Sequence, residues 1–183
     1  DSLTMGYKVA EEQITYLKKG DHATNLPSTI RYGGTVNGEF VLTDNLKYIY
    51  DNMGNVSEIR ENGNLLAKYS YDSINRLIRE DNKKFGKSYF FSYDNNGNIL
   101  RREETPFTLK PKDEITSDFI TFNYYYDGDK LISYNGEICE YDNLGQPTIY
   151  RGKTVEFTEF GGISSFDGKT FTCTSDRLRR QCR

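Results

Sequence analysis

The chain has 183 residues, which suits one ordinary domain or one large β unit. Its 15 Tyr, 11 Phe and 16 Gly, with no Trp, favour pleated, half-buried strands joined by turns over helices. The net charge of −3, with both signs interspersed, excludes a strong field for attracting nucleic acid, and no apolar stretch approaches the ~18 residues of a membrane span.

The first segment, residues 1–39, is predicted to be an irregular or degenerate repeat β segment. We expect short strands at residues 9–17 and 29–32, with Gly-containing turns at 33–34 and 37–38. Because the chain starts without Met and without a signal peptide, we expect a mature or excised piece of a longer protein.

A degenerate motif fills residues 40–183: an aromatic residue, any residue, Tyr, Asp, two residues, then Gly or Asn, a polar residue and an aliphatic residue. In chain order, its five copies contain Tyr50, Asp51 and Gly54; Tyr71, Asp72 and Asn75; Tyr93, Asp94 and Gly97; Tyr126 and Asp127; and Tyr141, Asp142 and Gly145. The fourth copy is one residue shorter than the others. A sixth copy is expected at residues 171–178, with Cys in the Tyr position.

Each copy is predicted to form one β-hairpin. The aromatic residues two positions apart lie on one face of a strand. The Asp suits the first position of a turn, where its carboxylate accepts backbone N–H bonds. The Gly or Asn three residues later suits the left-handed backbone conformation that completes the hairpin. The Tyr and Asp are therefore predicted to be structural repeat residues.

Second turns lie between the copies, at residues 61–64, 84–87 and 134–137, and the Asn-Gly pairs in two of them indicate hairpins. Together the two sets of turns predict an all-β fold, a continuous antiparallel meander from about Phe40 to Phe171. An exposed loop at residues 104–117, which contains Pro106 and Pro111, is expected to interrupt the meander.

The repeated Asp residues also suggest a paired-carboxylate glycosidase. Their identical local context favours turn capping, because a glycosidase places its acid and its base in different environments. Residues 94–98 are similar to a calcium loop, but their Gly is misplaced and Thr105 stands where a bidentate Glu is required. The turn interpretation is therefore preferred for the Asp residues.

Other reactive side chains lack suitable partners in the sequence. His22, the single histidine, is expected in an exposed loop, since nothing near it resembles a nucleophile elbow. Cys139, Cys173 and Cys182 form no CxxC pair and indicate neither a disulfide framework nor a zinc site, and Cys173 is expected to be a buried small hydrophobe on a strand. The basic residues at 177–183 are expected to belong to a degenerate repeat or chain end. We predict no catalytic residue, no cofactor and no bound metal.

The aromatic stripe has two interpretations. Exposed Tyr side chains on a sheet stack against sugar rings or bases. Alternatively, the Tyr side chains pack across strands between neighbouring repeats, and such aromatic pairs contribute roughly 0.2–1 kcal/mol each. A Tyr in every copy, with no Trp in the chain, favours packing.

These motifs resemble the RHS or YD-repeat family. The resemblance rests on Tyr-Asp-x-x-Gly at residues 50–54, 93–97 and 141–145, and on Tyr-Asp-x-x-Asn at 71–75. The stretch that begins at residue 141 is similar to the YD-x-x-GNP-T variant common in long Gram-positive members, with Gln146 in the usual place of Asn. The resemblance covers residues 40–183 well and residues 1–39 weakly.

The resemblance implies a long β-sheet that spirals into a hollow shell, in a secreted or cell-surface protein of a Gram-positive bacterium. In the family's polymorphic toxins the shell encloses a variable C-terminal toxin domain, and in animal teneurins a related shell supports cell adhesion. The Asp-Pro segment that closes the shell before the toxin is not found here, because no Pro follows an Asp. The cargo domain is therefore expected outside this chain.

We predict a non-catalytic structural segment of a secreted or cell-surface RHS-type protein, which forms part of a β-shell that encloses or presents a C-terminal toxin or cargo domain. Its expected partners are the adjacent repeats of the parent chain and that cargo, with no nucleic acid. The alternative is a carbohydrate-binding or adhesion module that binds cell-surface or cell-wall glycans through exposed tyrosines. Since repeat arrays depend on their neighbours, the isolated chain is expected to self-associate, aggregate or close with a terminal strand.

Overall fold

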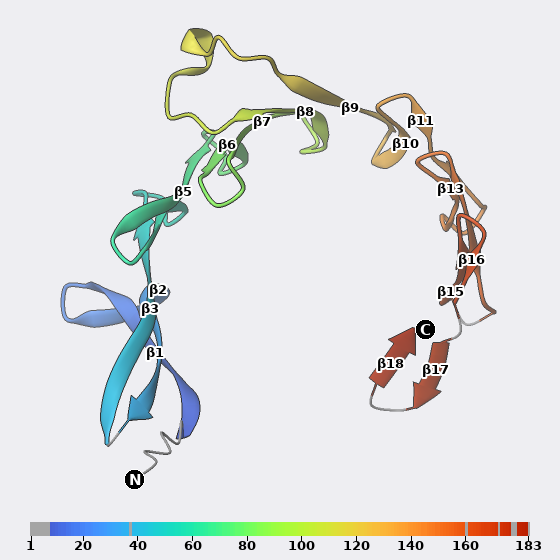
Figure 1. The fold of residues 1–183 in the computed structure, drawn as a ribbon. Coiled ribbons are helices and arrows are strands. Elements are labelled where there is room, and N and C mark those ends of the chain that lie inside the picture. The colour runs from blue at the N-terminus through green and yellow to red at the C-terminus, as the bar shows by residue number, and fades with distance from the viewer. Residues whose placement is uncertain (1–7, 37, 160, 172, 177–178, 183) are drawn as a thin grey trace. The chain divides into compact units, whose positions relative to one another are not determined.

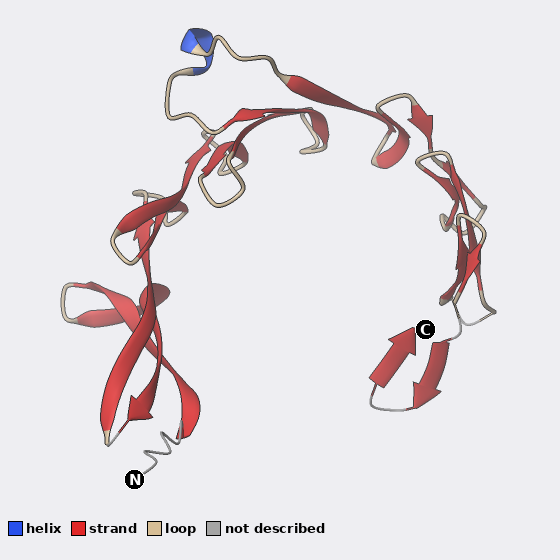
Figure 2. Cartoon of the chain, in the orientation of Figure 1, coloured by secondary structure: helices blue, strands red, loops and turns tan. Residues whose placement is uncertain are grey.

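Antiparallel strands account for most of the protein, in a computed structural model that describes residues 8–36, 38–159, 161–171, 173–176 and 179–182 (Figures 1 and 2). The strands are β1 (Lys8–Lys19), β2 (His22–Val36), β3 (Glu39–Tyr50), β4 (Val56–Glu61), β5 (Asn64–Tyr71), β6 (Leu77–Asn82), β7 (Lys87–Tyr93), β8 (Ile99–Pro106), β9 (Ile120–Asp127), β10 (Lys130–Tyr134), β11 (Glu137–Ile138), β12 (Glu140–Tyr141), β13 (Pro147–Tyr150), β14 (Lys153–Phe157), β15 (Ile163–Phe166), β16 (Lys169–Thr170), β17 (Cys173–Asp176) and β18 (Arg179–Cys182). Within the described residues, the helical content is one 3-10 turn, η1 (Lys112–Glu114). The predicted all-β class is confirmed.

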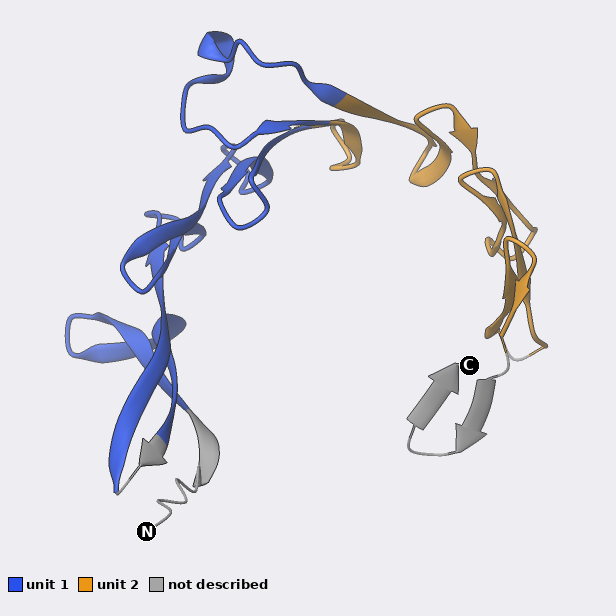
Figure 3. Ribbon diagram, in the orientation of Figure 1, with its two compact units in different colours: residues 1–91, 103–120 blue, residues 92–102, 121–183 orange. Residues whose placement is uncertain are grey.

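The strand order follows the chain order throughout. Strands β1 to β11 form an eleven-stranded sheet, β12 to β16 a five-stranded sheet, and β17 and β18 a two-stranded sheet. The predicted antiparallel meander of hairpins is therefore confirmed, although it is divided among three sheets. Two units are distinguished, residues 1–91 with 103–120, and residues 92–102 with 121–183 (Figure 3). They are called unit 1 and unit 2.

The buried apolar core of each unit is small. In the described part of unit 1 it consists of Ala67 and Phe90, and in the described part of unit 2 of Tyr134, Cys139 and Val155. Most other strand side chains are half-buried, as in the uniform burial of β4. Such a pattern arises when strands are packed chiefly by their neighbours within one sheet, since a second layer buries every other residue fully.

The N-terminal segment is more regular than predicted, because Gly33 and Gly34 lie inside β2 and not in a turn. They pair with Leu42 and Val41 of β3, beside a bulge. A Cβ added at Gly33 would lie 2.3 Å from the Val41 carbonyl oxygen and 2.6 Å from the ring of Phe40. Here glycine permits close approach of two strands, which is its other common use in a sheet.

The meander is interrupted at Cys139, where a continuous run to Phe171 was predicted. β11, before Cys139, pairs with β10, whereas β12, after it, pairs with β13. The Cys139 N–H still donates to the Ile132 carbonyl at 2.8 Å, and the Gly152 N–H donates to the Ile138 carbonyl at 2.8 Å. The interruption is thus a change of hydrogen-bonding partner along one extended stretch, which the repeat pattern alone does not reveal.

Candidate functional site: the Tyr–Asp turns

In four of the five copies, the turn that follows the repeat strand is built around one carboxylate. Asp51 Oδ1 accepts the backbone N–H groups of Met53 and Asn55, both at 2.9 Å. The main chain closes the same turn, since the Asp51 N–H donates to the Asn55 carbonyl at 2.9 Å. The same pair of carboxylate bonds, to the second and fourth following residues, occurs at Asp72, Asp94 and Asp142, at distances of 2.8 to 3.0 Å.

The second oxygen of the carboxylate is also bonded in three of these turns. Asp51 Oδ2 accepts from Asn55 Nδ2 at 3.1 Å, Asp94 Oδ2 from Asn98 Nδ2 at 2.9 Å, and Asp72 Oδ2 from Arg76 Nε at 2.7 Å. Each of these carboxylates accepts hydrogen bonds on both oxygens, and the ionised form of Asp is the one that accepts on both without donating.

These hydrogen bonds lower the pKa of the three aspartates. At Asp51, desolvation raises the pKa, but the bonds from Asn55 and the following N–H groups outweigh it. The backbone N–H of Arg76 is the main cause of the lowered pKa of Asp72. The side-chain amide of Asn98 is the main cause at Asp94.

The backbone of the four turns is left-handed at the predicted position. The φ angles are +89° at Gly54, +65° at Asn75, +94° at Gly97 and +80° at Gly145. Nothing lies within 4 Å of a Cβ added at Gly54, Gly97 or Gly145. The requirement for Gly or Asn is therefore one of backbone conformation and not of space.

The repeat tyrosines use their hydroxyl groups to bond a neighbouring segment. Tyr71 donates to the Val56 carbonyl at 2.9 Å, and Tyr141 donates to the Leu131 carbonyl at 3.0 Å. Val56 is the first residue of β4 and Leu131 the second residue of β10, the strands that return from the preceding copies. Tyr50, in the first copy, donates to the Pro27 carbonyl of β2 at 2.7 Å. These three hydroxyls thus link the first, second and fifth copies to the segment before each of them.

All five repeat tyrosines are half-buried. Desolvation raises the pKa of Tyr50, Tyr71, Tyr126 and Tyr141, as expected for phenols turned away from water. Neighbouring turns also touch directly in unit 1, where Asn55 Nδ2 donates to Asn75 Oδ1 at 2.8 Å. The residues that define the repeat therefore form contacts within and between copies.

The fourth copy has a different turn. Asp127 lies at the end of β9 and pairs with Lys130 across a two-residue turn of Gly128 and Asp129. The shorter spacing in this copy leaves no room for the five-residue carboxylate turn. Asp127 is therefore a strand residue in the structure, and this copy keeps its Tyr126 without the turn found in the other four.

The structure reveals one copy of this turn that the sequence pattern missed, at residues 158–162. The Thr158 N–H donates to the Gly162 carbonyl at 2.7 Å, and the Gly162 N–H donates to Thr158 Oγ1 at 3.1 Å. Gly161 has a φ of +75°. Thr158 thus occupies the Asp position, and Phe157 precedes it in the Tyr position. The available signal was the Gly three residues after a hydroxyl residue, at the end of an alternating strand.

The sixth copy expected at residues 171–178 lies only partly within the described residues. Cys173 lies at the start of β17 and pairs through its backbone with Cys182 of β18. The side chains of Cys173 and of the basic tail lie outside the described residues. Cys139 is a free, buried cysteine.

The chain from 107 to 119, here called the strap, follows β8 and packs against β6 and β7 within unit 1. The Phe107 N–H donates to the Gly86 carbonyl at 2.8 Å. The Thr108 carbonyl accepts from Ser88 Oγ and from Arg79 Nη2, each at 2.9 Å. At its other end the Phe119 ring meets the Phe90 ring edge-to-face, with centroids 5.8 Å apart.

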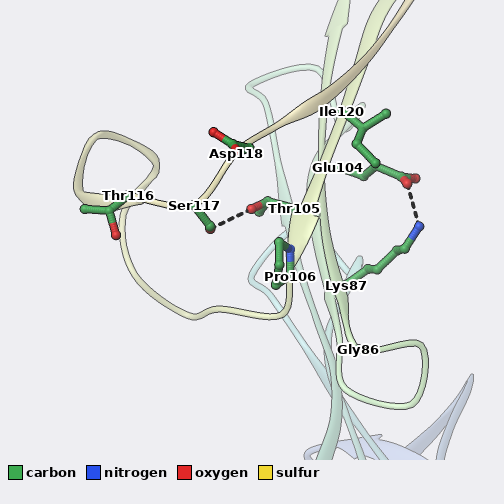
Figure 4. A pocket seen from close by; sticks show the side chains of 9 residues that line it. All are labelled: Gly86, Lys87, Glu104, Thr105, Pro106, Thr116, Ser117, Asp118 and Ile120. Carbon is green, nitrogen blue, oxygen red and sulfur yellow. Dashed lines mark hydrogen bonds and ion pairs between the residues drawn. The ribbon is translucent and has the colours of Figure 1, made fainter.

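The strap begins later than the predicted exposed loop, because β8 extends to Pro106 and its residues 103–105 are buried. Glu104 and Thr105 are only 8% and 4% exposed. Lys87 forms an ion pair with Glu104, and Thr105 Oγ1 lies 2.9 Å from Ser117 Oγ (Figure 4). These contacts bury Glu104 and Thr105, which the sequence had placed in an exposed loop, whereas Pro106 and residues 109–114 of that loop are exposed.

A cavity of about 580 Å³ lies between β8 and the end of the strap, lined among others by Lys87, Glu104, Ser117 and Ile120 (Figure 4). Its volume is that of a small-ligand site. However, its lining contains no His or Cys, so a nucleophile paired with an imidazole base is not formed there. His22 lies far along the chain from it, exposed at the start of β2.

The described residues contain no group of three or more His, Cys, Asp or Glu side chains placed to hold a metal ion. In the same part of the chain, none of the helical structure is long and apolar enough to span a membrane.

Acid is expected to destabilise the Tyr–Asp turns. The folded pKa values of Asp51, Asp72 and Asp94 lie below the unfolded value of about 3.9, so their contribution to stability is present above that value and is lost as the pH falls through the lowered values. Urea unfolding between pH 7 and pH 2.5 measures this as a midpoint that declines below about pH 4.

The matched variant for this titration is Asp94→Asn, which keeps the size of the side chain but carries no charge. It is expected to be less stable at pH 7 and to lose less stability than the wild type on acidification. Equal acid losses in the two proteins would contradict the role assigned to Asp94.

Known proteins share this repeat and this fold. Residues 11–157 match the family described as Teneurin YD-shell. The fold is similar to that of the Tc holotoxin pore of Photorhabdus luminescens, with a TM-score of 0.60 at 16% identity, and to that of the TcdB2–TccC3–Cdc42 complex, with 0.59 at 15%. In both cases the match covers 93% of this chain and 9% of the other chain. No curated protein matches the sequence significantly.

Proposed function

Because this chain belongs to the teneurin YD-shell family, we propose that it is a non-catalytic wall segment of a larger β-shell that encloses or presents a C-terminal toxin or cargo domain. The chain spans about a tenth of the solved chains that share its fold, so it supplies only part of such a wall. A secreted or cell-surface location follows from this proposal, while the Gram-positive origin stays a prediction from the sequence.

The tyrosine bonds between copies carry this proposal. A catalytic or binding residue turns its functional atom toward a ligand, whereas the hydroxyls of Tyr50, Tyr71 and Tyr141 are used on backbone carbonyls of neighbouring segments. The repeat tyrosine makes the same kind of contact in the first, second and fifth copies. This use suits a residue whose role is to hold one repeat to the next.

The exposed apolar side chains support a role within a larger assembly. Met53, Ile74 and Leu144 occupy the same position in three Tyr–Asp turns and are 70%, 64% and 86% exposed. Large apolar side chains repeated at one exposed position are typical of surfaces that another part of a protein covers. The proposed partners are accordingly the adjacent repeats of the parent chain and its cargo domain.

The second candidate is a carbohydrate-binding or adhesion module. One observation favours it: Tyr125, which alternates with the repeat tyrosines on β9, is 58% exposed. An exposed phenol offers a flat face for a sugar ring. In this case the glycan-binding residue is Tyr125, which lies between two repeat positions, and not the repeat tyrosines themselves.

Two substitutions at Tyr71 separate these functions. Tyr71→Phe is expected to lower the free energy of unfolding by about 1 kcal/mol, because it removes only the bond to Val56. Tyr71→Ala and Tyr93→Ala are expected to cost more, because they also remove a half-buried ring. Urea unfolding measures both effects. Glycan-array binding by the wild type, lost in a folded Tyr125→Ala protein, would contradict the wall proposal in favour of adhesion.

Tyr71→Phe in the full parent chain tests enclosure of the cargo. Limited proteolysis of the wild-type parent should leave the cargo domain intact under conditions that digest the cargo alone. In the Tyr71→Phe parent, the cargo should be digested faster at temperatures close to the unfolding of the wall. Digestion of the cargo at the same rate with and without the wall would refute enclosure.

A further inference from the structure

The strap covers one face of the sheet in unit 1. Arg79 of β6 pairs with Phe90 of β7, so their side chains lie on one face, and both side chains contact the strap. Glu80, the next residue of β6, pairs with Tyr69 and Tyr89, whose side chains lie on the opposite face. The strap therefore adds a second layer to the face opposite these tyrosines, where Phe90 is only 7% exposed.

Lys112 fastens the strap to this face through its ammonium group. Lys112 lies in η1, and its Nζ forms an ion pair with Glu103 of β8. The same Nζ lies over the rings of Phe90 and Phe119, 5.1 Å and 5.7 Å from the two ring centroids. A carboxylate and two aromatic faces suit an alkylammonium ion, because all three present negative charge or the negative face of a quadrupole to it.

The groups that receive the ammonium are buried, whereas the part of the strap that supplies it is exposed. Glu103 is 8% exposed. In contrast, residues 109–114, here called the tip of the strap, are all exposed, and the Lys112 side chain keeps 50% of its accessible surface. Of the hydrogen bonds, ion pairs and ring contacts described for the tip, those that reach the sheet are made by Lys112. The tip is thus held to the sheet at one side chain.

A second cation beside Phe90 has partners of its own. The guanidinium carbon of Arg79 lies 5.0 Å from the Phe90 ring centroid. Arg79 Nε donates to Asp81 Oδ1 and Arg79 Nη2 donates to the Thr108 carbonyl, each at 2.9 Å. Asp81 is 2% exposed, so this ion pair belongs to the interior of the sheet face. Arg79 is held by contacts that do not involve Lys112, and it anchors the strap at Thr108 independently of the tip.

We propose that Glu103, Phe90 and Phe119 form a binding site for a primary alkylammonium group, here called the ammonium site, and that Lys112 occupies it as an internal ligand. An external alkylammonium group, the lysine side chain of a partner protein, competes with Lys112 and releases the tip. A primary ammonium suits the site because it donates hydrogen bonds to the Glu103 carboxylate, which a quaternary ammonium cannot do. The inference concerns contacts within unit 1 and does not depend on the proposed wall function.

Removal of the internal ligand tests the site in the full parent chain. Lys112→Ala is expected to bind n-butylammonium, the free equivalent of a lysine side chain, with a Kd on the order of 1 mM by ligand-observed NMR. The wild type is expected to bind about tenfold more weakly or worse, because occupancy by Lys112 leaves only a fraction of the sites open. n-Butyltrimethylammonium, which cannot donate to Glu103, is expected to bind Lys112→Ala more weakly than the primary amine.

The strap offers a matched control for this experiment. Lys110 is an exposed lysine of the same tip, and its side chain makes none of the described contacts with the ammonium site. Lys110→Ala should therefore bind n-butylammonium as the wild type does. Glu103→Gln, added to Lys112→Ala, keeps the shape of the site without its charge and should abolish the gain in binding. Phe119→Leu in the same background keeps an apolar side chain without a ring and should weaken binding about threefold or more.

Cleavage of the tip measures its release. A glutamyl endopeptidase cuts after Glu114, an exposed residue of η1, and mass spectrometry distinguishes this cut from cuts elsewhere in the parent chain. Lys112→Ala should be cut faster at Glu114 than the wild type. n-Butylammonium should speed the cut in the wild type toward the rate of Lys112→Ala, whereas the same concentration of sodium chloride should do so less. It should leave the rate in Lys112→Ala unchanged.

Three outcomes would overturn the proposal. They are equal binding of n-butylammonium by the wild type and Lys112→Ala, binding by Lys112→Ala that survives both Glu103→Gln and Phe119→Leu, and cleavage of the wild type at Glu114 that n-butylammonium does not speed. Circular dichroism of each variant confirms that the sheet is intact, so a loss of binding is not attributed to unfolding.

Discussion

Replacement of Tyr134 by Ala is expected to lower the free energy of unfolding of unit 2 by about 3–5 kcal/mol, the range found when large aromatic residues are removed from a core. Tyr134 is only 9% exposed, and it lies at the centre of a stack of rings and cations. Its ring centroid lies 6.1 Å from that of Phe122 and 4.9 Å from that of Tyr124, and the guanidinium carbon of Arg151 lies 3.7 Å from it.

Loss of the Tyr134 ring has a large effect because the described part of unit 2 has few other buried apolar side chains, so little other buried packing remains. Arg151 comes from the turn between β13 and β14, while Phe122 and Tyr134 lie on β9 and β10. The cation–π contact thus connects strands of the two sheets that meet at Cys139. Loss of the ring removes this connection together with the packing.

Urea unfolding of Tyr134→Ala and Tyr125→Ala measures the difference. Tyr125 lies on β9 but is 58% exposed, so the same chemical change there is expected to cost less than about 1 kcal/mol. Tyr134→Phe, which keeps the ring, should lie close to the wild type. Similar losses in the two Ala variants would show that the stack does not stabilise unit 2.

Substitution of Gly33 by Ala is expected to cost about 3 kcal/mol, at the upper end of the usual range for an overpacked site. The added Cβ meets the Val41 carbonyl oxygen at 2.3 Å and the Phe40 ring at 2.6 Å. The Phe40 ring is a side chain that can rotate, but the Val41 carbonyl belongs to the backbone of β3 and moves only with the strand. The bulge between β2 and β3 must therefore open.

Thermal unfolding of Gly33→Ala against Gly162→Ala isolates this effect. At Gly162 an added Cβ would lie 3.4 Å from Thr158 Oγ1, an ordinary contact with a short side chain. Neither glycine has a positive φ, so both substitutions avoid backbone strain of that kind. A Gly33→Ala melting temperature equal to that of Gly162→Ala would contradict the close approach of β3.

The sequence predicted the hairpins because their signals are local. The Asp, the Gly or Asn three residues later and the alternating aromatics act within one turn, and the observed bonds of Asp51 and Asp94 lie within four residues of each carboxylate. The antiparallel meander follows from turns of this kind in series. Membership of the family could be inferred from the same residues, because they recur in order.

A turn with a substituted acceptor, and features that depend on contacts between distant residues, could not be predicted. The turn at Thr158 was missed because its oxygen acceptor is a Thr hydroxyl in place of an Asp carboxylate, and because Phe157 stands in the Tyr position. Gly33 was assigned to a turn because its close contact is with Phe40 and Val41 on another strand. The burial of Glu104 depends on the strap, which returns to cover it from further along the chain.

One consequence of the strand order concerns the way the chain folds. Every strand of the meander pairs with strands adjacent in the sequence. The strand pairs that stabilise a hairpin are therefore made with the strands directly before and after it in the chain. Loop closure within such a hairpin involves few residues and has a small entropic cost. A nascent chain emerging from the ribosome, or from a secretion channel, can therefore add one hairpin at a time to the last, without waiting for its C-terminus.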